Sequence, residues 1–252
     1  ERIDATVRQA LHRGDTPGAV LLIAASGLTL FHKAYGFRAK VPEERPMAPD
    51  TLFDLASLTK AIVTSTCIVL LIEQGLIRLH DRIASHLPEW SSNTKDGKDE
   101  ITIEHLLMHT SGLISSSAQG DYTQGLSKAL VKIHAQRLLS SPGTRYEYSD
   151  LGYIILGALI ERKTGQSLDV FAQNHLFGPL GMRDTVFSPS DAQQKWRTAL
   201  TESVDGHFVA GQVHDPRARL FGGRAGYAGR FSTADVLSRF AFMLMYCGKY
   251  HR

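Results

Sequence analysis

The sequence predicts an α+β fold for the 252-residue chain, and three observations carry this prediction. A helical pattern opens the chain, a strand–turn–strand pattern follows it, and several separate apolar segments with helical stops occupy most of the remainder. The chain is 43% hydrophobic and 21% charged, which is an ordinary balance for a domain with a large core. The sequence shows no internal repeat and no clean compositional boundary.

A helix and a hairpin are predicted at the start of the chain. Residues 2–12 place apolar side chains at helical spacing. After the break at Pro17-Gly18, two apolar segments separated by a glycine predict a β-hairpin over about 19–37. A polar connection leads to the segment "DLASLTKAIVTSTCIVLLIEQG", residues 54–75, which predicts a buried helix that ends near its last glycine.

The helices further along are identified by their caps and stops. Residues 101–113 predict a short helix that Thr102 caps and Gly112 stops. A strongly apolar helix over 151–165 is expected to stop at Gly165. Other helices are predicted over residues 128–139, 167–177 and about 233–245, with a loop-rich stretch between 178 and 230.

Composition and charge argue against several classes of protein. The net charge of +3 is scattered, and the sequence has no basic stripe of the kind that binds nucleic acid. The two cysteines, Cys67 and Cys247, make neither a disulfide framework nor a zinc site. The most apolar stretch, residues 61–72, is too short to span a bilayer. We therefore expect neither a nucleic-acid partner nor a transmembrane segment.

A metal site is not expected either. His105 and His109 have the i, i+4 spacing of a metal-binding pair on a helix, but no glutamate follows His105 and the sequence offers no evident third ligand. We expect His109 to fix a loop instead. No cofactor is expected, because the chemistry that the next segments predict needs only side chains and a backbone N–H.

The segment Ser57-Leu58-Thr59-Lys60 places a serine and a lysine on one face at the start of the buried helix. The free N–H groups and the dipole of a helix N-terminus stabilise an alkoxide or oxyanion there. Burial among apolar neighbours disfavours an ammonium, so Lys60 can take the proton of Ser57 as a neutral amine. The same spacing recurs at Ser92-Asn93-Thr94-Lys95, where a polar context predicts a solvated turn.

A second candidate group, Tyr148-Ser149-Asp150, occupies a turn just before the 151–165 helix. A phenol near an ammonium can act as a general base or proton relay, which is the function considered for Tyr148. The alternative is that Tyr148 packs while Ser149 or Asp150 caps the helix, and the two interpretations are compatible.

Together these segments resemble the first two motifs of the serine β-lactamase and penicillin-binding protein superfamily, and most closely the branch with class C β-lactamases, D-Ala carboxypeptidases and related esterases. The resemblance implies one catalytic domain over 1–252. This domain would contain an antiparallel sheet flanked by helices and a helical subdomain at about 76–225, with the site between the sheet and the subdomain. Further similar blocks follow in order at residues 106–113, 141–165, 177–187 and 226–240.

The resemblance also implies how the two groups work. Ser57 would be acylated, Lys60 would activate it, and Tyr148 would serve as base and proton shuttle. The backbone N–H of Ser57 would form half of an oxyanion hole. Asp150 stands where the family usually has asparagine, and an ionised carboxylate only accepts hydrogen bonds. Asp150 is therefore expected either to contact substrate or to hold Lys60 as a cation.

Two other residues are expected near the substrate. His214 lies in the segment "VHDPRARLFGG", which resembles a loop near the family's pocket, although a structural turn is the alternative. Tyr227, in Gly-Tyr-Ala-Gly, is expected to border the cleft.

The family's third motif, K-T-G or H-T-G on a strand that lines the site, is not assigned. Lys163-Thr164-Gly165 matches its letters but lies at a predicted helix end, so we interpret it as a helix stop. In the family this third motif comes after a helix that resembles residues 231–240 of this chain, and the chain stops shortly after these residues. We therefore expect either that the natural protein continues past Arg252 or that another chain supplies the strands that pair with the hairpin. The 252-residue chain alone is expected to be poorly soluble or oligomeric.

The sequence thus predicts a serine hydrolase that acts through an acyl-enzyme on Ser57. Its substrate would be a D-alanyl peptide, a β-lactam or a small ester. The alternative is a non-hydrolysing penicillin or muropeptide sensor, or an inactive relic. The expected partner is a small-molecule or peptidoglycan-derived substrate, and only the resemblance favours a location outside the cytoplasm.

Overall fold

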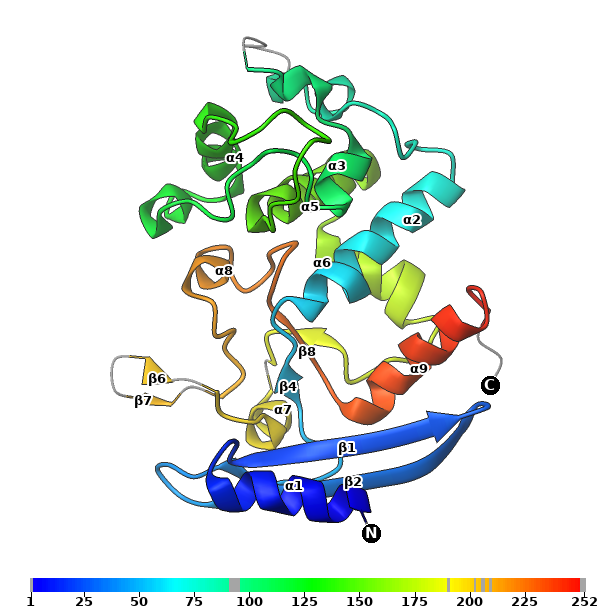
Figure 1. The fold of residues 1–252 in the computed structure, drawn as a ribbon, viewed down its shortest axis with the longest axis vertical. Helices are drawn as coiled ribbons and strands as arrows, with labels where there is room; N and C mark the ends of the chain where they lie inside the picture. Colours follow the sequence, from blue (N-terminus) through cyan, green and yellow to red (C-terminus); the bar gives the residue numbers. More distant parts are fainter. Residues whose placement is uncertain are drawn as a thin grey trace. The chain divides into compact units, whose positions relative to one another are not determined.

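The computed structural model describes residues 2–90, 96–189, 191–201, 203–204, 207–208 and 210–249 (Figure 1). They belong to two compact units. The sheet unit comprises Glu1–Leu55, Phe177–His214 and Arg230–Arg252, and the helical unit comprises Ala56–Leu176 and Asp215–Gly229. The second S-x-x-K copy, at 92–95, lies outside the described residues, so its predicted turn stays a prediction.

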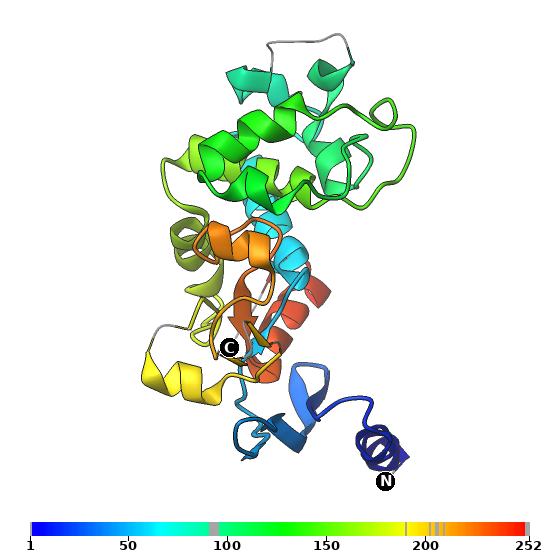
Figure 2. The same cartoon turned by 90° about the vertical axis from the view of Figure 1, so that its left-hand side faces the viewer.

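The hairpin predicted near the N-terminus is confirmed in the sheet unit. β1, Gly18–Ala25, pairs antiparallel with β2, Leu28–Ala39. Both turn residues, Ser26 and Gly27, have positive φ, at 51° and 80°, which is the turn whose twist matches two antiparallel strands. The predicted first helix, α1, Arg2–Arg13, lies beside β2 (Figures 1 and 2). A third short strand, β3, Arg45–Pro46, extends the sheet on the side of β2.

A second antiparallel sheet in the same unit has the strand order β4–β8–β5. Its strands are β4, Phe53–Asp54, β8, Arg230–Ser232, and β5, Val186–Phe187. The predicted C-terminal helix is confirmed as α9, Ala234–Met245, which Thr233 caps and which packs against β1. β4 ends at Asp54, three residues before Ser57 in the sequence.

The stretch 178–230 is more regular than the loop-rich prediction. It contains two helices that were not predicted, and each is capped by an aspartate, Asp191 or Asp215. Each aspartate accepts a hydrogen bond from a backbone N–H of the first helical turn. Both helices are short, which leaves little periodicity to detect. The stretch holds β5, α7 (Ala192–Arg197), β6 (Ser203–Val204), β7 (His207–Phe208), α8 (Pro216–Leu220) and the start of β8.

The helical unit is organised around α5, Asp150–Thr164. Every residue from Leu151 to Ile160 is buried, as expected for a helix that is apolar all round. Gly165, with φ 67°, ends the helix, which confirms the helix stop predicted for Lys163-Thr164-Gly165. α5 contacts α2 (Thr66–Glu73), α3 (Ile103–Leu107), α4 (Leu126–Ala135) and α6 (Leu168–Ala172).

Three of the described helices differ in detail from the prediction. Thr102 caps α3 in a reciprocal capping box with His105, as its position predicted, but the helix ends at Leu107 and not near Gly112. The reason is that His109, a non-glycine residue, takes the left-handed conformation with φ 58°. The predicted helix over 167–177 is α6 followed by a π-helical segment, Gln173–Phe177. α4 ends at Ala135, four residues before the predicted limit at 139.

Within its described residues, the helical unit also has four short 3₁₀ segments. They join the longer helices and tighten the connections between them. They span Ile83–Ser85, Pro88–Trp90, Lys98–Glu100 and Gln119–Tyr122.

Helices combined with antiparallel sheets confirm the predicted α+β class. Within the described residues, no helix is both long and apolar enough to span a bilayer. Cys67 is a buried free thiol and Cys247 an exposed one.

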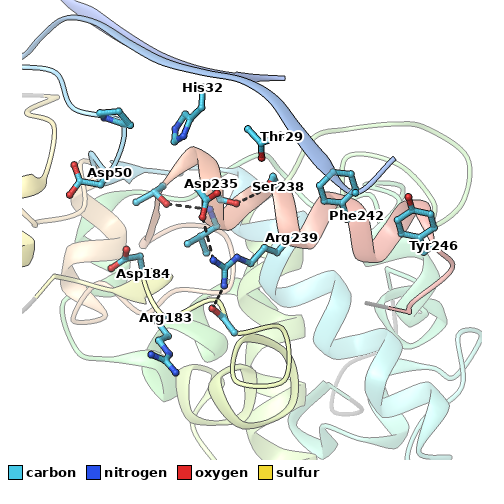
Figure 3. A pocket seen from close by; sticks show the side chains of 15 residues that line it. Thr29, His32, Asp50, Arg183, Asp184, Asp235, Ser238, Arg239, Phe242 and Tyr246 are labelled. Atoms are coloured by element: carbon cyan, nitrogen blue, oxygen red, sulfur yellow. Dashed lines mark hydrogen bonds and ion pairs between the residues drawn. The ribbon is translucent and has the colours of Figure 1, made fainter. Parts of the chain in front are cut away.

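A cavity of about 970 Å³ lies in the sheet unit between β2 and α9 (Figure 3). Thr29 and His32 line it from β2, and Asp235, Ser238 and Phe242 line it from α9. None of the predicted site residues lines this cavity. This cavity is therefore separate from the candidate site, which is defined by the side chains around Ser57.

Candidate active site

Ser57 stands exposed at the start of the helix that the sequence predicts. The residue before it, Ala56, has φ 46°, a left-handed conformation that is uncommon for a residue with a side chain. Such strain is maintained only where the surroundings fix it, and it is common at functional sites. The backbone thus turns sharply at Ala56 and presents the Ser57 hydroxyl at the helix N-terminus.

The helix itself begins as a π-helical segment, Lys60–Ser65, and continues as α2 to Glu73. The sequence analysis predicted a helix that ends near Gly75, which is confirmed, but did not predict the π geometry. The hydroxyl of Thr66 donates to the carbonyl of Ala61, five residues back, which suits the wider turn. π-Helical turns within helices occur frequently at functional sites.

Lys60 is the centre of a compact polar cluster. Its side chain is 5% exposed, and Nζ lies 3.0 Å from Ser57 Oγ and 2.7 Å from Asp150 Oδ1. The contact with Asp150 is a close ion pair that lacks the alignment of a hydrogen bond. Nζ also lies 3.5 Å from the backbone carbonyl oxygen of Tyr227. The structure therefore brings Ser57, Lys60 and Asp150 together through one amine.

Three tyrosine rings surround the same amine. Lys60 Nζ lies 4.7 Å from the ring centroid of Tyr148, 5.4 Å from that of Tyr227 and 5.8 Å from that of Tyr153. Aromatic faces attract a cation at these distances, most strongly where water is excluded. The sequence analysis placed Lys60 among apolar neighbours, whereas the structure places it among one carboxylate and three aromatic rings.

Tyr148 and Asp150 are positioned by the residue between them. Ser149 caps α5, with its hydroxyl accepting from the N–H of Gly152 and donating to the carbonyl of Ile114 at 2.7 Å. The N–H of Asp150 donates to the carbonyl of Ser115 at 2.8 Å. The capping that the sequence analysis considered as an alternative for this group is confirmed, and it coexists with the approach of Asp150 to Lys60.

Tyr227 is fixed by its hydroxyl. Its side chain is 2% exposed, and the hydroxyl donates to Asp215 Oδ1 at 2.7 Å. Burial, and then the hydrogen bond to Asp215, raise the pKa of Tyr227 far above its ordinary value, so the phenol stays protonated. The ring and the backbone carbonyl of Tyr227 face Lys60. The predicted contact of Tyr227 with substrate stays a prediction.

Gly226 allows the segment that carries Tyr227 to approach α5. A β-carbon at this position would lie 2.1 Å from the carbonyl oxygen of Tyr153, a distance that only a shift of backbone could relieve. The carbonyl oxygen of Gly226 accepts from the hydroxyl of Thr64 at 2.5 Å, one helical turn after Lys60. Because Gly226 has no side chain, the segment with Tyr227 can lie close enough to α5 for its carbonyl to reach Lys60.

We expect Gly226→Ala to lower the free energy of unfolding by about 1–3 kcal/mol, because the added methyl group overpacks a rigid site. Urea denaturation of the purified chain measures this change. Gly120→Ala is the matched control, since a β-carbon there meets nothing within 4 Å. Equal stability of the two variants would show that the backbone at Gly226 is not closely packed in solution.

His109, in the loop after α3, also contacts the residues of this cluster. Its Nδ1 accepts from the backbone N–H of Ser149 at 3.0 Å, and its ring stacks on Tyr148 with a centroid distance of 4.4 Å. The prediction that His109 fixes a loop is confirmed by this bond. His105 caps α3, and the described residues contain no group of three or more side chains that could hold a metal ion.

His214 belongs to the sheet unit. Its backbone N–H and its Nδ1 both lie within hydrogen-bond distance of Asp54 Oδ2, at 2.8 and 2.9 Å. The Asp54 side chain is 2% exposed, so this contact has the character of the structural turn considered as the alternative. A contact between His214 and substrate stays a prediction.

Tyr153 and Thr64 are site residues that the sequence analysis missed. Tyr153 donates to the carbonyl of Leu107 at 3.2 Å and contacts the hydroxyl of Ser65 at 3.1 Å. Helical spacing offered a signal for both, since Tyr153 follows Asp150 by three residues and Thr64 follows Lys60 by four.

Comparison with known proteins identifies the family of the chain. The profile of the family described as Beta-lactamase matches residues 3–246. An N-acetylmuramyl-L-alanine amidase of Bacillus subtilis (strain 168) is 31% identical over 280 residues, which cover 99% of this chain and 63% of the amidase. A putative D-alanyl-D-alanine carboxypeptidase of Escherichia coli (strain K12) is 34% identical over 252 residues, which cover 87% of this chain and 58% of the carboxypeptidase.

A solved structure shows the same fold. A class C beta-lactamase, 20% identical, superposes with a TM-score of 0.83 over 99% of this chain and 65% of that one. The predicted β-lactamase-like fold is confirmed by this likeness. The chain spans 63% and 58% of the lengths of the two relatives named above.

Proposed function

Because the chain belongs to the Beta-lactamase family, as its motifs predicted, we propose that it is a serine hydrolase that acts through an acyl-enzyme on Ser57. The observation that carries the proposal is the 3.0 Å contact between Lys60 Nζ and Ser57 Oγ at the N-terminus of a helix. A hydroxyl in contact with a buried lysine, at the positive end of a helix dipole, is suited to nucleophilic attack. No metal or cofactor is needed for this chemistry.

The ion pair with Asp150 supports different functions for the two proposed bases. Lys60 Nζ forms an ion pair with Asp150 and lies 3.0 Å from Ser57 Oγ, and we propose that it donates a hydrogen bond to that oxygen and stabilises negative charge there. Tyr148, with its ring 4.7 Å from the same amine, is then the group proposed to accept the serine proton.

The proposed reaction has two balanced halves. Ser57 Oγ attacks the substrate carbonyl carbon while its proton passes to Tyr148, and the tetrahedral intermediate then expels an amine or alcohol that takes this proton. Water repeats the sequence on the ester that has formed, giving a carboxylic acid and free Ser57. The backbone N–H of Ser57 is proposed to stabilise the intermediate's oxyanion.

We propose an acyl compound related to peptidoglycan as the substrate. The support is indirect: the two relatives are named for an N-acetylmuramyl-L-alanine bond and for a D-alanyl-D-alanine bond. A β-lactam or a small ester offers the same electrophilic carbonyl. The proposed substrate class is therefore defined by the carbonyl carbon that Ser57 attacks.

Mass spectrometry tests the proposal directly. The chain is exposed to a penicillin, to an activated ester and to an acyl-D-alanyl-D-alanine peptide, and peptide mapping locates any covalent adduct. An adduct on Ser57 that forms and is released supports a hydrolase. A persistent adduct favours the penicillin or muropeptide sensor, and absence of an adduct with all three compounds contradicts the acyl-enzyme.

The identity of residue 150 is expected to affect substrate preference. We expect Asp150→Asn to raise the acylation rate with an acylamino β-lactam relative to a simple ester, because an amide can donate a hydrogen bond to the substrate's amide carbonyl. Stopped-flow acylation with both compounds measures the ratio. An equal loss with both substrates would show that Asp150 acts on Lys60 alone.

A further inference from the structure

His109 has an unusual combination of constraints for a residue in a loop. Its φ of 58° lies in the left-handed region, which histidine occupies uncommonly. Its backbone carbonyl accepts from the N–H of Glu147, and its Nδ1 accepts from the N–H of Ser149. The backbone on both sides of Tyr148 is therefore bonded to one histidine.

Tyr148 has few other constraints on its side chain. The ring is 39% exposed, and among the described residues its hydroxyl makes no hydrogen bond. Its ring is held by the stack on His109, with centroids 4.4 Å apart and planes inclined by 29°, and by the ammonium of Lys60. Of these two neighbours, only His109 presents a flat surface that sets the plane of the phenol.

We infer that His109 is the positioning residue for Tyr148: through the Ser149 N–H and the ring stack, it holds the phenol at the angle and distance that proton transfer from Ser57 requires. This inference rests on the proposed function, in which Tyr148 accepts that proton. His109 itself touches neither substrate nor the reacting atoms, so it acts through Tyr148.

The bond to Ser149 requires a neutral imidazole, because Nδ1 can accept only when it carries no proton. Burial, and then the positive charge of Lys60, lower the pKa of His109 below its ordinary value of 6.5, against the opposing effect of Asp150. The other titratable groups that face the ring are the phenols of Tyr146, Tyr148 and Tyr153.

A lowered pKa fixes the sign of the pH dependence. The contribution of His109 to stability is fully present above pH 6.5 and is lost as the pH falls through the lowered value in the folded chain. Protonation there would remove the acceptor for Ser149 and disturb Tyr148 together with it. The positioning of Tyr148 is therefore intact at neutral pH and weakens in acid.

Two substitutions separate the contacts of His109. His109→Asn keeps a side-chain oxygen that can accept from Ser149 and tolerates positive φ, but it removes the ring. His109→Phe keeps a ring that can stack on Tyr148 but removes the acceptor. The variant that loses the stack, His109→Asn, is expected to lose more catalytic activity. The variant that loses the hydrogen bond, His109→Phe, is expected to lose more stability.

We expect His109→Asn to keep a Tm close to that of the unmodified chain while kcat for an activated ester falls roughly tenfold to hundredfold, with KM little changed. His109→Phe should lower Tm more and kcat less. The acid limb of kcat/KM that His109 causes should be absent from both variants. His80→Asn is the control, since His80 is exposed and pairs with Glu104.

A purely structural function of His109 would make kcat follow Tm in the two variants, and that result would overturn the inference. Crystal structures of the variants give a measurement that needs no activity. The Tyr148 ring should leave its position in His109→Asn and keep it in His109→Phe, and an unmoved ring in His109→Asn would also overturn the inference. A lack of adduct on Ser57 in the unmodified chain would instead refute the proposed function alone.

Discussion

Ser57→Ala is expected to abolish covalent adducts with penicillin and activated ester, and to lower turnover of any substrate by about 10⁶-fold, the scale seen when a catalytic serine is removed. The hydroxyl that contacts Lys60 is the only atom of the cluster suited to form the acyl bond among the residues that the structure describes. Mass spectrometry of the intact protein, followed by kinetic assay, measures both effects.

Ser92→Ala is the matched control for this change, because it removes the serine of the other S-x-x-K copy at identical spacing. We expect Ser92→Ala to leave adduct formation and Tm unchanged. Circular dichroism should show that Ser57→Ala remains folded, since the hydroxyl is exposed and its removal leaves no cavity. Loss of acylation in Ser92→Ala with retention in Ser57→Ala would reverse the assignment of the nucleophile.

The parts of this fold that the sequence could predict depend on local chemistry. A helix start at Ser57, a cap at Thr102, a stop at Gly165 and a turn at Gly27 each follow from the few residues around them. Spacing also placed Ser57 beside Lys60, because residues three apart on a helix are neighbours.

The parts that the sequence could not predict depend on contacts between distant segments. The stack of His109 on Tyr148 joins residues 39 positions apart, and the bond from Thr64 to Gly226 joins residues 162 positions apart. The sequence around His109 does not predict its positive φ, because such a conformation is uncommon for any residue other than glycine. The π-helical segment was also missed, because apolar periodicity over six residues does not separate it from an α-helix.

These distant contacts explain why the site lies within one compact unit. Ser57 and Lys60 come from the start of the helix that continues as α2, Tyr148 and Asp150 from the turn into α5, and the Tyr227 carbonyl from the segment before β8. All of these residues belong to the helical unit. The lysine is therefore buried by its own unit, and the ion pair with Asp150 forms part of that unit's core.

The second large effect is expected at Lys60. We expect Lys60→Met to lower kcat/KM by about 10³-fold, because the donor to Ser57 Oγ and the positive charge beside Tyr148 are both lost. The same change leaves the Asp150 carboxylate without its partner, and breaking a buried ion pair costs about 3–5 kcal/mol of stability. Asp150 is 22% exposed, so we expect the lower end, about 3 kcal/mol.

A double-mutant cycle separates catalysis from stability at this pair. In Lys60→Met combined with Asp150→Asn no buried charge remains, so most of the lost stability should return, with a coupling energy of about 1–3 kcal/mol from urea denaturation. Activity should not return, because no amine contacts Ser57. If the double variant regained turnover together with stability, Lys60 would be a structural counter-ion for Asp150, and the proton chemistry on Ser57 would have to come from Tyr148 without it.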